Sequence, residues 1–322
     1  MHSIKFDPQD RYIAAGTISS DEARDNGTIQ IFNLKKQNTT CTISNESKTP
    51  FSYICWRPEN ENFKTKNILT TANADGEIQN WHLNSGKCLS TIKDDSPTID
   101  KQLYCLDFNH DGTKLVACGS EPIVRVYDEV KRKKVMDLEE SNAPHNSHSN
   151  RVYCAKFNKD PAFEHLIYSG GWDQTLVVWD TRSQKPVQNV FGPYICGDGI
   201  ATCGMDLLTA SWRQNDQLQQ WDARNNACEL NETLDWDGIK LSGVPCFLYT
   251  CQFSKKHQDM IIAGGSNSNE VKLFDKSNNN KPFCAIYNLP REIDTVDFSY
   301  DDSMFAISGA DGYVRVFSIS EL

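Results

Sequence analysis

The sequence predicts an all-β protein, a seven-bladed propeller built from blades of four antiparallel strands, and three observations predict it. One pattern of short apolar strands separated by polar turns recurs seven times, and each copy closes with an aromatic residue. Neighbouring closing aromatics lie 42 to 53 residues apart, which matches a propeller repeat of about 40–45 residues stretched by loops. No stretch of 12 residues shows helical periodicity. The closing aromatics are Phe32, Trp81, Tyr127, Trp179, Trp221, Phe274 and Phe317.

The fourth copy shows the repeating unit most clearly, between residues 151 and 191. Its first three strands are predicted at RVYCAKF, HLIYSGG and TLVVWD, and PVQNVF follows as the outer strand. The central strands of a blade face neighbouring blades on both sides. We therefore expect them as continuous apolar runs and not as a strict alternation of apolar and polar residues.

The other six copies follow the same order along the chain. Their inner three strands are expected within residues 3–33, 53–82, 103–128, 204–222, 249–275 and 289–318. The chain is therefore predicted to be a single domain with no second unit. Its seven blades are expected at approximately residues 1–44, 50–92, 100–138, 148–191, 198–234, 246–287 and 290–322.

The dipeptides Trp179-Asp180 and Trp221-Asp222 make the chain resemble the WD40-repeat family, and the resemblance covers essentially the whole sequence. It implies a seven-bladed WD40 β-propeller. In that family a loop His, a strand Ser or Thr, a hairpin Asp and the closing Trp form a buried hydrogen-bonded chain. One copy in this sequence carries the full set, at His148, Ser169, Asp173 and Trp179.

Only six outer strands are expected for the seven blades. Five residues follow Phe317 and three precede Ile4, too few for a turn and a strand. Propellers of the family usually complete the last blade with an N-terminal strand. Either the start of the chain is truncated, or the last blade is three-stranded with an open edge. An open edge exposes unpaired backbone groups, which are a template for strand donation by a partner.

The composition excludes several classes of partner and compartment. The net charge is −10, which argues against a nucleic-acid or acidic-membrane partner, because both need a basic surface. No run of about 18 apolar residues is present, and the N-terminus lacks the basic and apolar regions of a signal peptide. Twelve cysteines without a CxxC pair are expected as reduced thiols. The sequence therefore predicts a cytoplasmic protein, with the cytoskeleton or a cilium as more specific locations.

The sequence carries no P-loop, HExxH or GxSxG motif, so we expect neither an enzyme nor a cofactor. Gly197-Asp198-Gly199 is interpreted as a turn before the fifth blade, because it lacks the strand-then-helix context of a phosphate loop. His145, His148 and Cys154 could be zinc ligands. The place of His148 in the buried chain, and the lack of a fourth ligand, favour a structural role and no metal site.

The best signal for a binding site comes from positions that line the narrow top face in the family. These positions lie four and six residues before the first-strand aromatic and directly before the hairpin Asp. Here they gather aromatic and Arg side chains over blades three to six, and such side chains dominate binding hot spots. The predicted protein-binding residues are Tyr104, Arg151, Tyr153, Trp172, Trp212, Arg213, Phe247 and Tyr249, with Gln102 beside them.

Two W-D-x-R motifs support an alternative. They resemble the motif by which some WD40 proteins dock on the propeller adaptor of cullin-based ubiquitin ligases, and Arg182 and Arg224 would bind that adaptor. The leading prediction is a non-enzymatic scaffold that binds a protein or peptide on its top face within a larger cytosolic or cytoskeletal, including ciliary, assembly. The alternative is a substrate receptor of a ubiquitin ligase.

Overall fold

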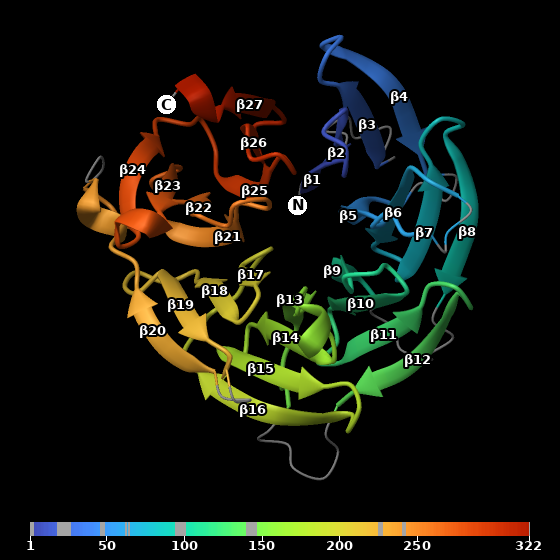
Figure 1. The fold of residues 1–322 in the computed structure, drawn as a ribbon, viewed down its shortest axis with the longest axis horizontal. Helices are drawn as coiled ribbons and strands as arrows, with labels where there is room; N and C mark the ends of the chain where they lie inside the picture. The colour runs from blue at the N-terminus through green and yellow to red at the C-terminus, as the bar shows by residue number, and fades with distance from the viewer. Residues whose placement is uncertain are drawn as a thin grey trace.

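The protein is a seven-bladed β-propeller, so the fold predicted from the sequence is confirmed (Figure 1). Its structure, a computed structural model, describes residues 3–17, 27–45, 49–61, 63, 65–93, 101–139, 147–224, 228–239 and 243–321. These residues form seven antiparallel sheets around one axis, six with four strands and the last with three. None of the helices formed by the described residues is long and apolar enough to cross a membrane.

The strands follow one another in chain order from the centre of each blade to its outer rim. Blades one and two contain β1 (Ser3–Phe6), β2 (Tyr12–Thr17), β3 (Thr28–Asn33) and β4 (Asn38–Ser44), and then β5 (Phe51–Trp56), β6 (Ile68–Asn73), β7 (Glu77–His82) and β8 (Lys87–Lys93). Blades three and four contain β9 (Leu103–Phe108), β10 (Lys114–Gly119), β11 (Val124–Asp128) and β12 (Lys133–Leu138), and then β13 (Val152–Phe157), β14 (Leu166–Gly171), β15 (Thr175–Asp180) and β16 (Lys185–Phe191). Blades five to seven contain β17 (Ile200–Cys203), β18 (Asp206–Ala210), β19 (Leu218–Asp222) and β20 (Glu229–Thr233), then β21 (Phe247–Phe253), β22 (Met260–Ser266), β23 (Val271–Asp275) and β24 (Lys281–Ile286), and last β25 (Ile293–Phe298), β26 (Met304–Gly309) and β27 (Val314–Ser318).

The ring closes through its innermost strands, where β1 of blade one lies beside β25 of blade seven (Figure 1). The backbone N–H of Ile4 donates to Thr295 Oγ1 at 3.4 Å, and that of Phe6 donates to Asp297 Oδ2 at 2.7 Å. Side-chain oxygens of the last blade thus accept hydrogen bonds from backbone N–H groups of β1 that face away from β2. These hydrogen bonds join the first and last blades at the centre of the ring.

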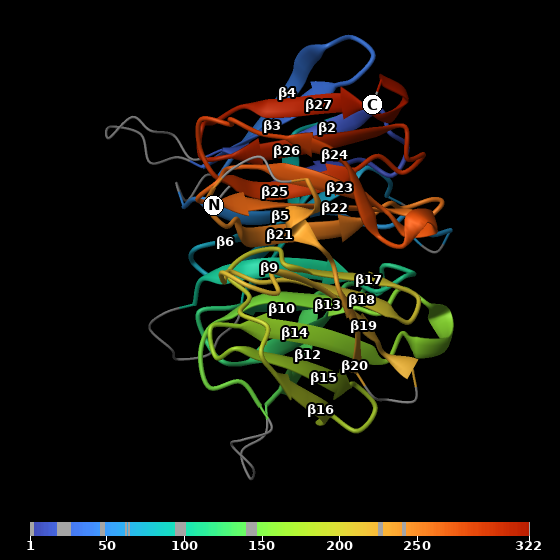
Figure 2. The ribbon, with the colours of Figure 1, turned by 90° about the vertical axis from the view of Figure 1, so that its left-hand side faces the viewer.

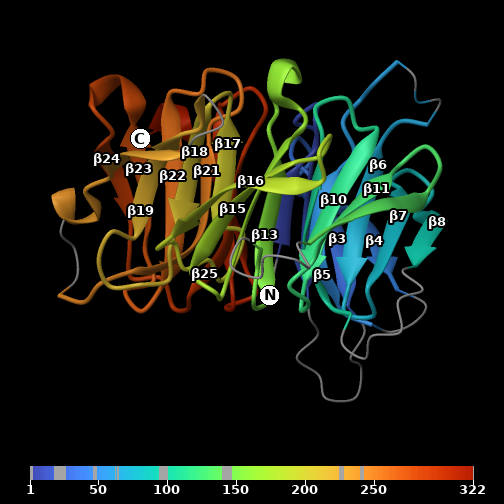
Figure 3. The ribbon, with the colours of Figure 1, turned by 90° about the horizontal axis from the view of Figure 1, so that it is seen from below.

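Seen edge-on, the molecule is a disc with the two chain ends toward opposite faces (Figures 2 and 3). We call the face that carries the loops between the fourth strand of one blade and the first strand of the next the top face. The turns between second and third strands lie on it as well. The opposite, bottom face carries the turns between first and second strands and between third and fourth strands.

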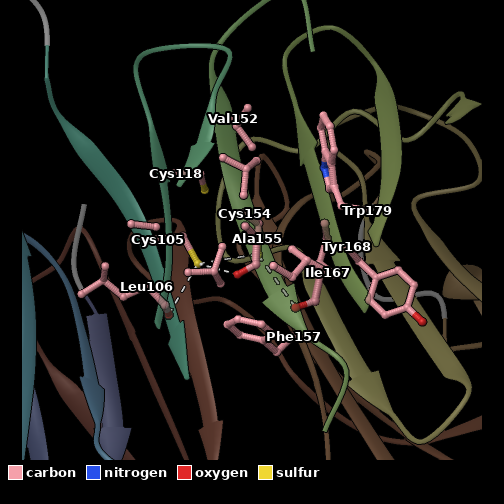
Figure 4. Close-up of a cluster of buried hydrophobic side chains, with 14 of the residues drawn as sticks. Cys105, Leu106, Cys118, Val152, Cys154, Ala155, Phe157, Ile167, Tyr168 and Trp179 are labelled. Atoms are coloured by element: carbon pink, nitrogen blue, oxygen red, sulfur yellow. Dashed lines mark hydrogen bonds between the residues drawn. The ribbon is translucent and has the colours of Figure 1, made fainter. Parts of the chain in front are cut away.

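The core lies between the blades and includes buried residues of the third strands of blades one to six. Leu176, Val177, Val178 and Trp179 are consecutive in β15 and all buried, as expected for strands covered on both sides. Figure 4 shows a part of this core between blades three and four, where three cysteine side chains lie among aliphatic and aromatic ones. They are Cys105, Cys118 and Cys154, and reduced thiols pack here as small hydrophobic groups.

Blade four contains a buried hydrogen-bonded chain made of four side chains. His148 Nδ1 lies 2.8 Å from Asp173 Oδ2, and His148 Nε2 lies 2.7 Å from Ser169 Oγ. The indole N–H of Trp179 donates to the same hydroxyl at 2.8 Å. The chain therefore connects the loop before the blade, two of its strands and its hairpin turn, and satisfies polar groups that would otherwise be buried alone.

Candidate functional site on the top face

Three aromatic rings form a continuous stack on the top face over blades three and four. Tyr104 comes from the start of β9, Tyr153 from the start of β13, and Trp172 from the turn between β14 and β15. The ring centroids of Tyr104 and Tyr153 lie 4.8 Å apart at an interplanar angle of 16°, and those of Tyr153 and Trp172 lie 5.5 Å apart at 28°. Trp172 is 39% exposed, and both tyrosines are half-buried. The stack thus presents flat apolar surface to solvent.

A cation borders this stack. The guanidinium carbon of Arg151 lies 5.5 Å from the centroid of the Trp172 ring, and Arg151 also hydrogen-bonds to Tyr153. Burial and the neighbouring Tyr104 raise the pKa of Tyr153 to about 12, so its hydroxyl remains protonated at neutral pH. On the other side of the stack, the Tyr104 hydroxyl donates to Gln102 Oε1 at 3.5 Å. An Arg held over an indole face is a typical anchor of protein interfaces.

A second aromatic cluster lies over blades five and six. Trp212 packs against Phe247 with centroids 5.0 Å apart, and against Tyr194 with centroids 6.1 Å apart. Its indole N–H donates to Ser266 Oγ at 3.3 Å, and the side chain is still 37% exposed. Tyr194 is absent from the residues predicted from the sequence, because it comes from an irregular stretch that no repeat position marks.

That stretch, residues 192–199 between β16 and β17, is called here the inserted segment. The backbone N–H of Ile195 donates to the carbonyl of Gly171, and Trp172 donates to the Cys196 side chain. Gly197 lies so close to β21 that an added Cβ would come within 2.6 Å of the Tyr249 carbonyl oxygen. Half-buried Tyr249 is therefore packed against the segment. The inserted segment connects the two aromatic clusters across blades four, five and six.

Arg213 was predicted as a binding residue, but the structure uses it to hold the turn of blade five. Its guanidinium donates to the carbonyl of Gly192 at 2.9 Å and to that of Asp216 at 2.7 and 3.0 Å. It also donates to the side chain of Gln219. These bonds occupy four of its five N–H donors within blade five and the inserted segment, whereas Arg151 beside Trp172 borders the open stack.

The inserted segment also carries Asp198 into the centre of the ring. Asp198 Oδ1 lies 2.6 Å from Lys156 Nζ, and Oδ2 lies 2.9 Å from Lys5 Nζ. The Tyr53 hydroxyl donates to Oδ2 at 2.8 Å. Burial alone would raise the pKa of Asp198, but the two ammonium groups lower it far below its usual range. The Gly197-Asp198-Gly199 turn predicted from the sequence is thus an ion-pair centre that links blades one, two and four.

A cavity of 780 Å³ continues from this centre toward the bottom face. Turns between first and second strands line it, including His110 and Lys159, together with Asp198 itself. Lys255 and Asp297 form a further ion pair on its wall, 2.9 Å apart. Charged groups of both signs therefore line the cavity. Within each ion pair named here, the two opposite charges neutralise each other.

One group of side chains in the described residues has the spacing of a metal site. The ligand atoms of Cys105, Cys154 and Asp198 lie within 4.8 Å of one another and are buried. The Lys156 ammonium at 2.6 Å already neutralises the carboxylate and would repel a cation. Burial raises the pKa of Cys154 well above its ordinary value, so its thiol is protonated and donates toward Asp198 Oδ1. The ammonium group beside the carboxylate therefore opposes the binding of a cation by these residues. Of the zinc ligands considered from the sequence, His145 lies outside the described residues.

The arginines of the two W-D-x-R motifs lie on the bottom face, in the turns between third and fourth strands of blades four and five. Arg182 Nη2 lies 2.8 Å from Asp180 Oδ2, and Arg224 Nη2 lies 2.5 Å from Asp222 Oδ2. The two arginine side chains are 66% and 72% exposed. Each guanidinium is thus held by the aspartate of its own motif and remains accessible.

The repeats of this propeller are similar to those of a known protein family. The family model described as "WD domain, G-beta repeat" matches residues 86–128, 141–180 and 286–318. These segments fall in blades two to four and six to seven of the propeller, and each ends at or directly after a closing aromatic residue. The chain contains three segments that match WD40 repeats and folds as a seven-bladed β-propeller. This WD40 propeller carries the full buried chain of four side chains in blade four, within the second matched segment.

Curated relatives of this WD40 propeller are distant. It is 25% identical to the methylosome protein WDR77 of Xenopus laevis over 59% of the chain and 52% of that protein. It is 24% identical to the nuclear distribution protein nudF of Aspergillus niger over 66% of the chain and 52% of that protein. The target of rapamycin complex subunit LST8-1 of Arabidopsis thaliana is 28% identical over 38% of the chain and 37% of that protein. The chain spans about half or less of the length of these relatives.

Proposed function

We propose that this WD40 propeller is a non-enzymatic scaffold that binds a protein or peptide on its top face within a multi-subunit assembly. The binding surface is the aromatic arc, which we define as Tyr104, Tyr153, Trp172, Trp212 and Phe247. One observation carries the proposal. The three-ring stack beside Arg151 keeps a tryptophan 39% exposed, although aromatic rings of this size are usually buried when no partner covers them.

The relatives support a role in assemblies. One is named as a subunit of the target of rapamycin complex and another as a methylosome protein. A rigid ring with interaction loops on one face suits this role, because loops on a stiff scaffold present anchors at little entropic cost. The mechanism is therefore binding alone, with no bond made or broken.

The arc also indicates what kind of segment binds. Its rings offer a flat apolar surface, and Arg151 offers a cation at the edge of that surface. An extended peptide with an apolar or aromatic side chain next to a carboxylate fits both features, because the guanidinium pairs with carboxylates through paired hydrogen bonds.

A pull-down with the double variant Arg151→Glu, Trp172→Ala tests the proposal. We expect recovery of the partner to fall about 30-fold or more, since hot-spot residues each contribute about 2 kcal/mol or more to binding. Tyr287→Ala is the matched control, because Tyr287 is an exposed aromatic residue that follows β24 and lies outside the arc. Unchanged recovery with the double variant would show that the arc is not the binding site.

The exposed W-D-x-R arginines favour a second candidate function, a substrate receptor of a cullin-based ubiquitin ligase. Arg182 and Arg224 would then dock on the ligase adaptor from the bottom face while the aromatic arc holds the substrate. With Arg182→Ala and Arg224→Ala combined, co-purification of the adaptor should be lost and partner binding on the top face retained. If wild-type protein recovers no adaptor, this candidate is excluded and the scaffold proposal stands alone.

A further inference from the structure

A surplus positive charge lies in the cavity of 780 Å³ that continues from Asp198 toward the bottom face, called here the bottom cavity. Two ammonium groups share the carboxylate of Asp198, that of Lys156 at 2.6 Å and that of Lys5 at 2.9 Å. Burial alone would lower the pKa of Lys5, but Asp198 and Asp297 raise it above its ordinary value. Burial alone would also lower the pKa of Lys156, but Asp198 raises it well above its ordinary value. Both lysines are therefore charged, and one carboxylate lies between two cations.

The other lysines on the wall of the bottom cavity have carboxylates of their own. Lys159 Nζ lies 2.7 Å from Asp107 Oδ2. Lys255 Nζ lies 2.9 Å from Asp297 Oδ2, and this carboxylate opposes the lowering of the pKa of Lys255 by burial. These two pairs are neutral, so they leave the surplus charge beside Asp198 in place. Because a buried charge without a counter-charge is unfavourable, this part of the wall favours an anion.

The remaining ionisable groups of the bottom cavity come from turns between first and second strands, at its mouth. Glu59 is exposed, so water screens its charge. Asp160 accepts a backbone hydrogen bond at the start of the short helix Pro161–Phe163. His110 lies 3.1 Å from a carboxylate oxygen of Glu164. The two ammonium groups that share one carboxylate come instead from the inner strands β1 and β13, at the centre of the ring.

Lys5 is the cation best placed to hold a ligand. Its ammonium group has three N–H donors, and among the described residues it donates one hydrogen bond, to Asp198 Oδ2 at 2.9 Å. The side chain is 12% exposed and lines the bottom cavity. Lys156, in contrast, donates to Asp198 and also to the Tyr53 hydroxyl at 2.8 Å. Lys5 therefore has donors left for an anion inside the cavity.

The size and the apolar lining of the bottom cavity indicate what kind of anion fits. Its volume falls within the range of about 300–1,000 Å³ that is typical of small-molecule sites. Aromatic rings pack well against the flat face of another ring. The surplus is a single charge, so a ligand with one negative charge balances it. The aromatic side chains that line the cavity include Phe6, Trp56, Phe108, Phe253 and Tyr300.

We propose that the bottom cavity binds a small aromatic monocarboxylate, with its carboxylate on Lys5 and its ring against the aromatic wall. A charge-assisted hydrogen bond from the ammonium group holds the carboxylate, and burial of the ring adds affinity. A phosphate dianion fits less well, because it would place a second negative charge close to Asp198 and Asp297. The bottom cavity lies on the face opposite to the aromatic arc, so this site is independent of the proposed scaffold function.

Isothermal titration calorimetry with 2-naphthoate as the probe, on the 322-residue protein, tests the proposal. We expect one molecule bound per chain, and binding of the uncharged 2-naphthylmethanol should be at least about tenfold weaker, because it cannot make the charge-assisted bond. Lys5→Met should weaken naphthoate binding by a similar factor and leave the alcohol unchanged, whereas Lys5→Arg should retain naphthoate. Lys256→Met is the matched control, because Lys256 is exposed and does not line the bottom cavity.

Circular dichroism and unchanged binding of the alcohol show that Lys5→Met is folded with its cavity intact. The double variant Arg151→Glu, Trp172→Ala should bind naphthoate like wild type, and a loss there would place the probe on the aromatic arc and overturn the proposal. Absence of naphthoate binding, equal affinity for the alcohol, or tighter binding of inorganic phosphate would also overturn it. None of these results changes the pull-down that tests the top face, so the two proposals fail separately.

Discussion

Replacing Asp198 with Asn is expected to lower the free energy of unfolding by about 3–5 kcal/mol, because it removes one partner of a buried ion-pair network. The substitution keeps the size of the side chain but leaves the ammonium groups of Lys156 and Lys5 with no counter-charge at 2.6 and 2.9 Å. Urea denaturation at pH 7, with the midpoint and slope compared to wild type, measures the loss. Asp216→Asn is the control, since Asp216 is exposed in the turn of blade five, and it should change stability little.

The buried charge of Asp198 also predicts that the stability of the protein depends on pH. The pKa of Asp198 is lowered in the folded protein, so its contribution is complete above the unfolded pKa of about 3.9 and declines as the pH falls further. The difference in stability between wild type and Asp198→Asn should therefore shrink by about 1 kcal/mol between pH 7 and pH 3. A difference that stays constant or grows at pH 3 would contradict the assignment of a charged Asp198.

Replacing Ser169 with Ala is expected to cost about 2–4 kcal/mol, because it leaves two buried polar groups without their shared partner. These groups are His148 Nε2 and the indole N–H of Trp179, at 2.7 and 2.8 Å from the serine hydroxyl. Thermal and chemical unfolding of the variant provide the measurement.

Ser169→Thr is the matched comparison for this prediction. Thr71 and Thr209 hold the corresponding positions in blades two and five, and each accepts from the closing tryptophan of its blade. The threonine variant should therefore retain most of the stability that the alanine variant loses. Equal losses for both variants would show that the hydroxyl is not responsible.

The sequence predicted the fold well because each blade repeats the same local requirements. A closing aromatic such as Trp179, a small-residue second strand and a polar hairpin recur at regular spacing, and each is visible without knowledge of the others. The same count left two alternatives, a truncated chain start or a three-stranded last blade, and the described residues of that blade form three strands. The sequence could group Tyr104, Tyr153 and Trp172 because they occupy repeat positions that lie on one rim, and the structure stacks their rings.

Features that depend on the inserted segment could not be predicted in the same way. This segment lies outside the repeat, so no repeat position indicated that Tyr194 belongs to an aromatic cluster or that Asp198 forms buried ion pairs. The partners of Asp198 are 193 and 42 residues away in sequence, and only the closed ring brings them together. The hydrogen bonds of Arg213 were also not predicted from the sequence, because most of its acceptors are backbone carbonyls, which any residue type provides.

The most direct test of the top-face site is hydrogen exchange and crosslinking on the protein captured with its native partner. Our account predicts slower exchange at the starts of β9 and β13 and in the turn that carries Trp172, with crosslinks gathered around Arg151 on the top face. Protection and crosslinks confined to the bottom face, with the aromatic arc as accessible as in the free protein, would contradict it.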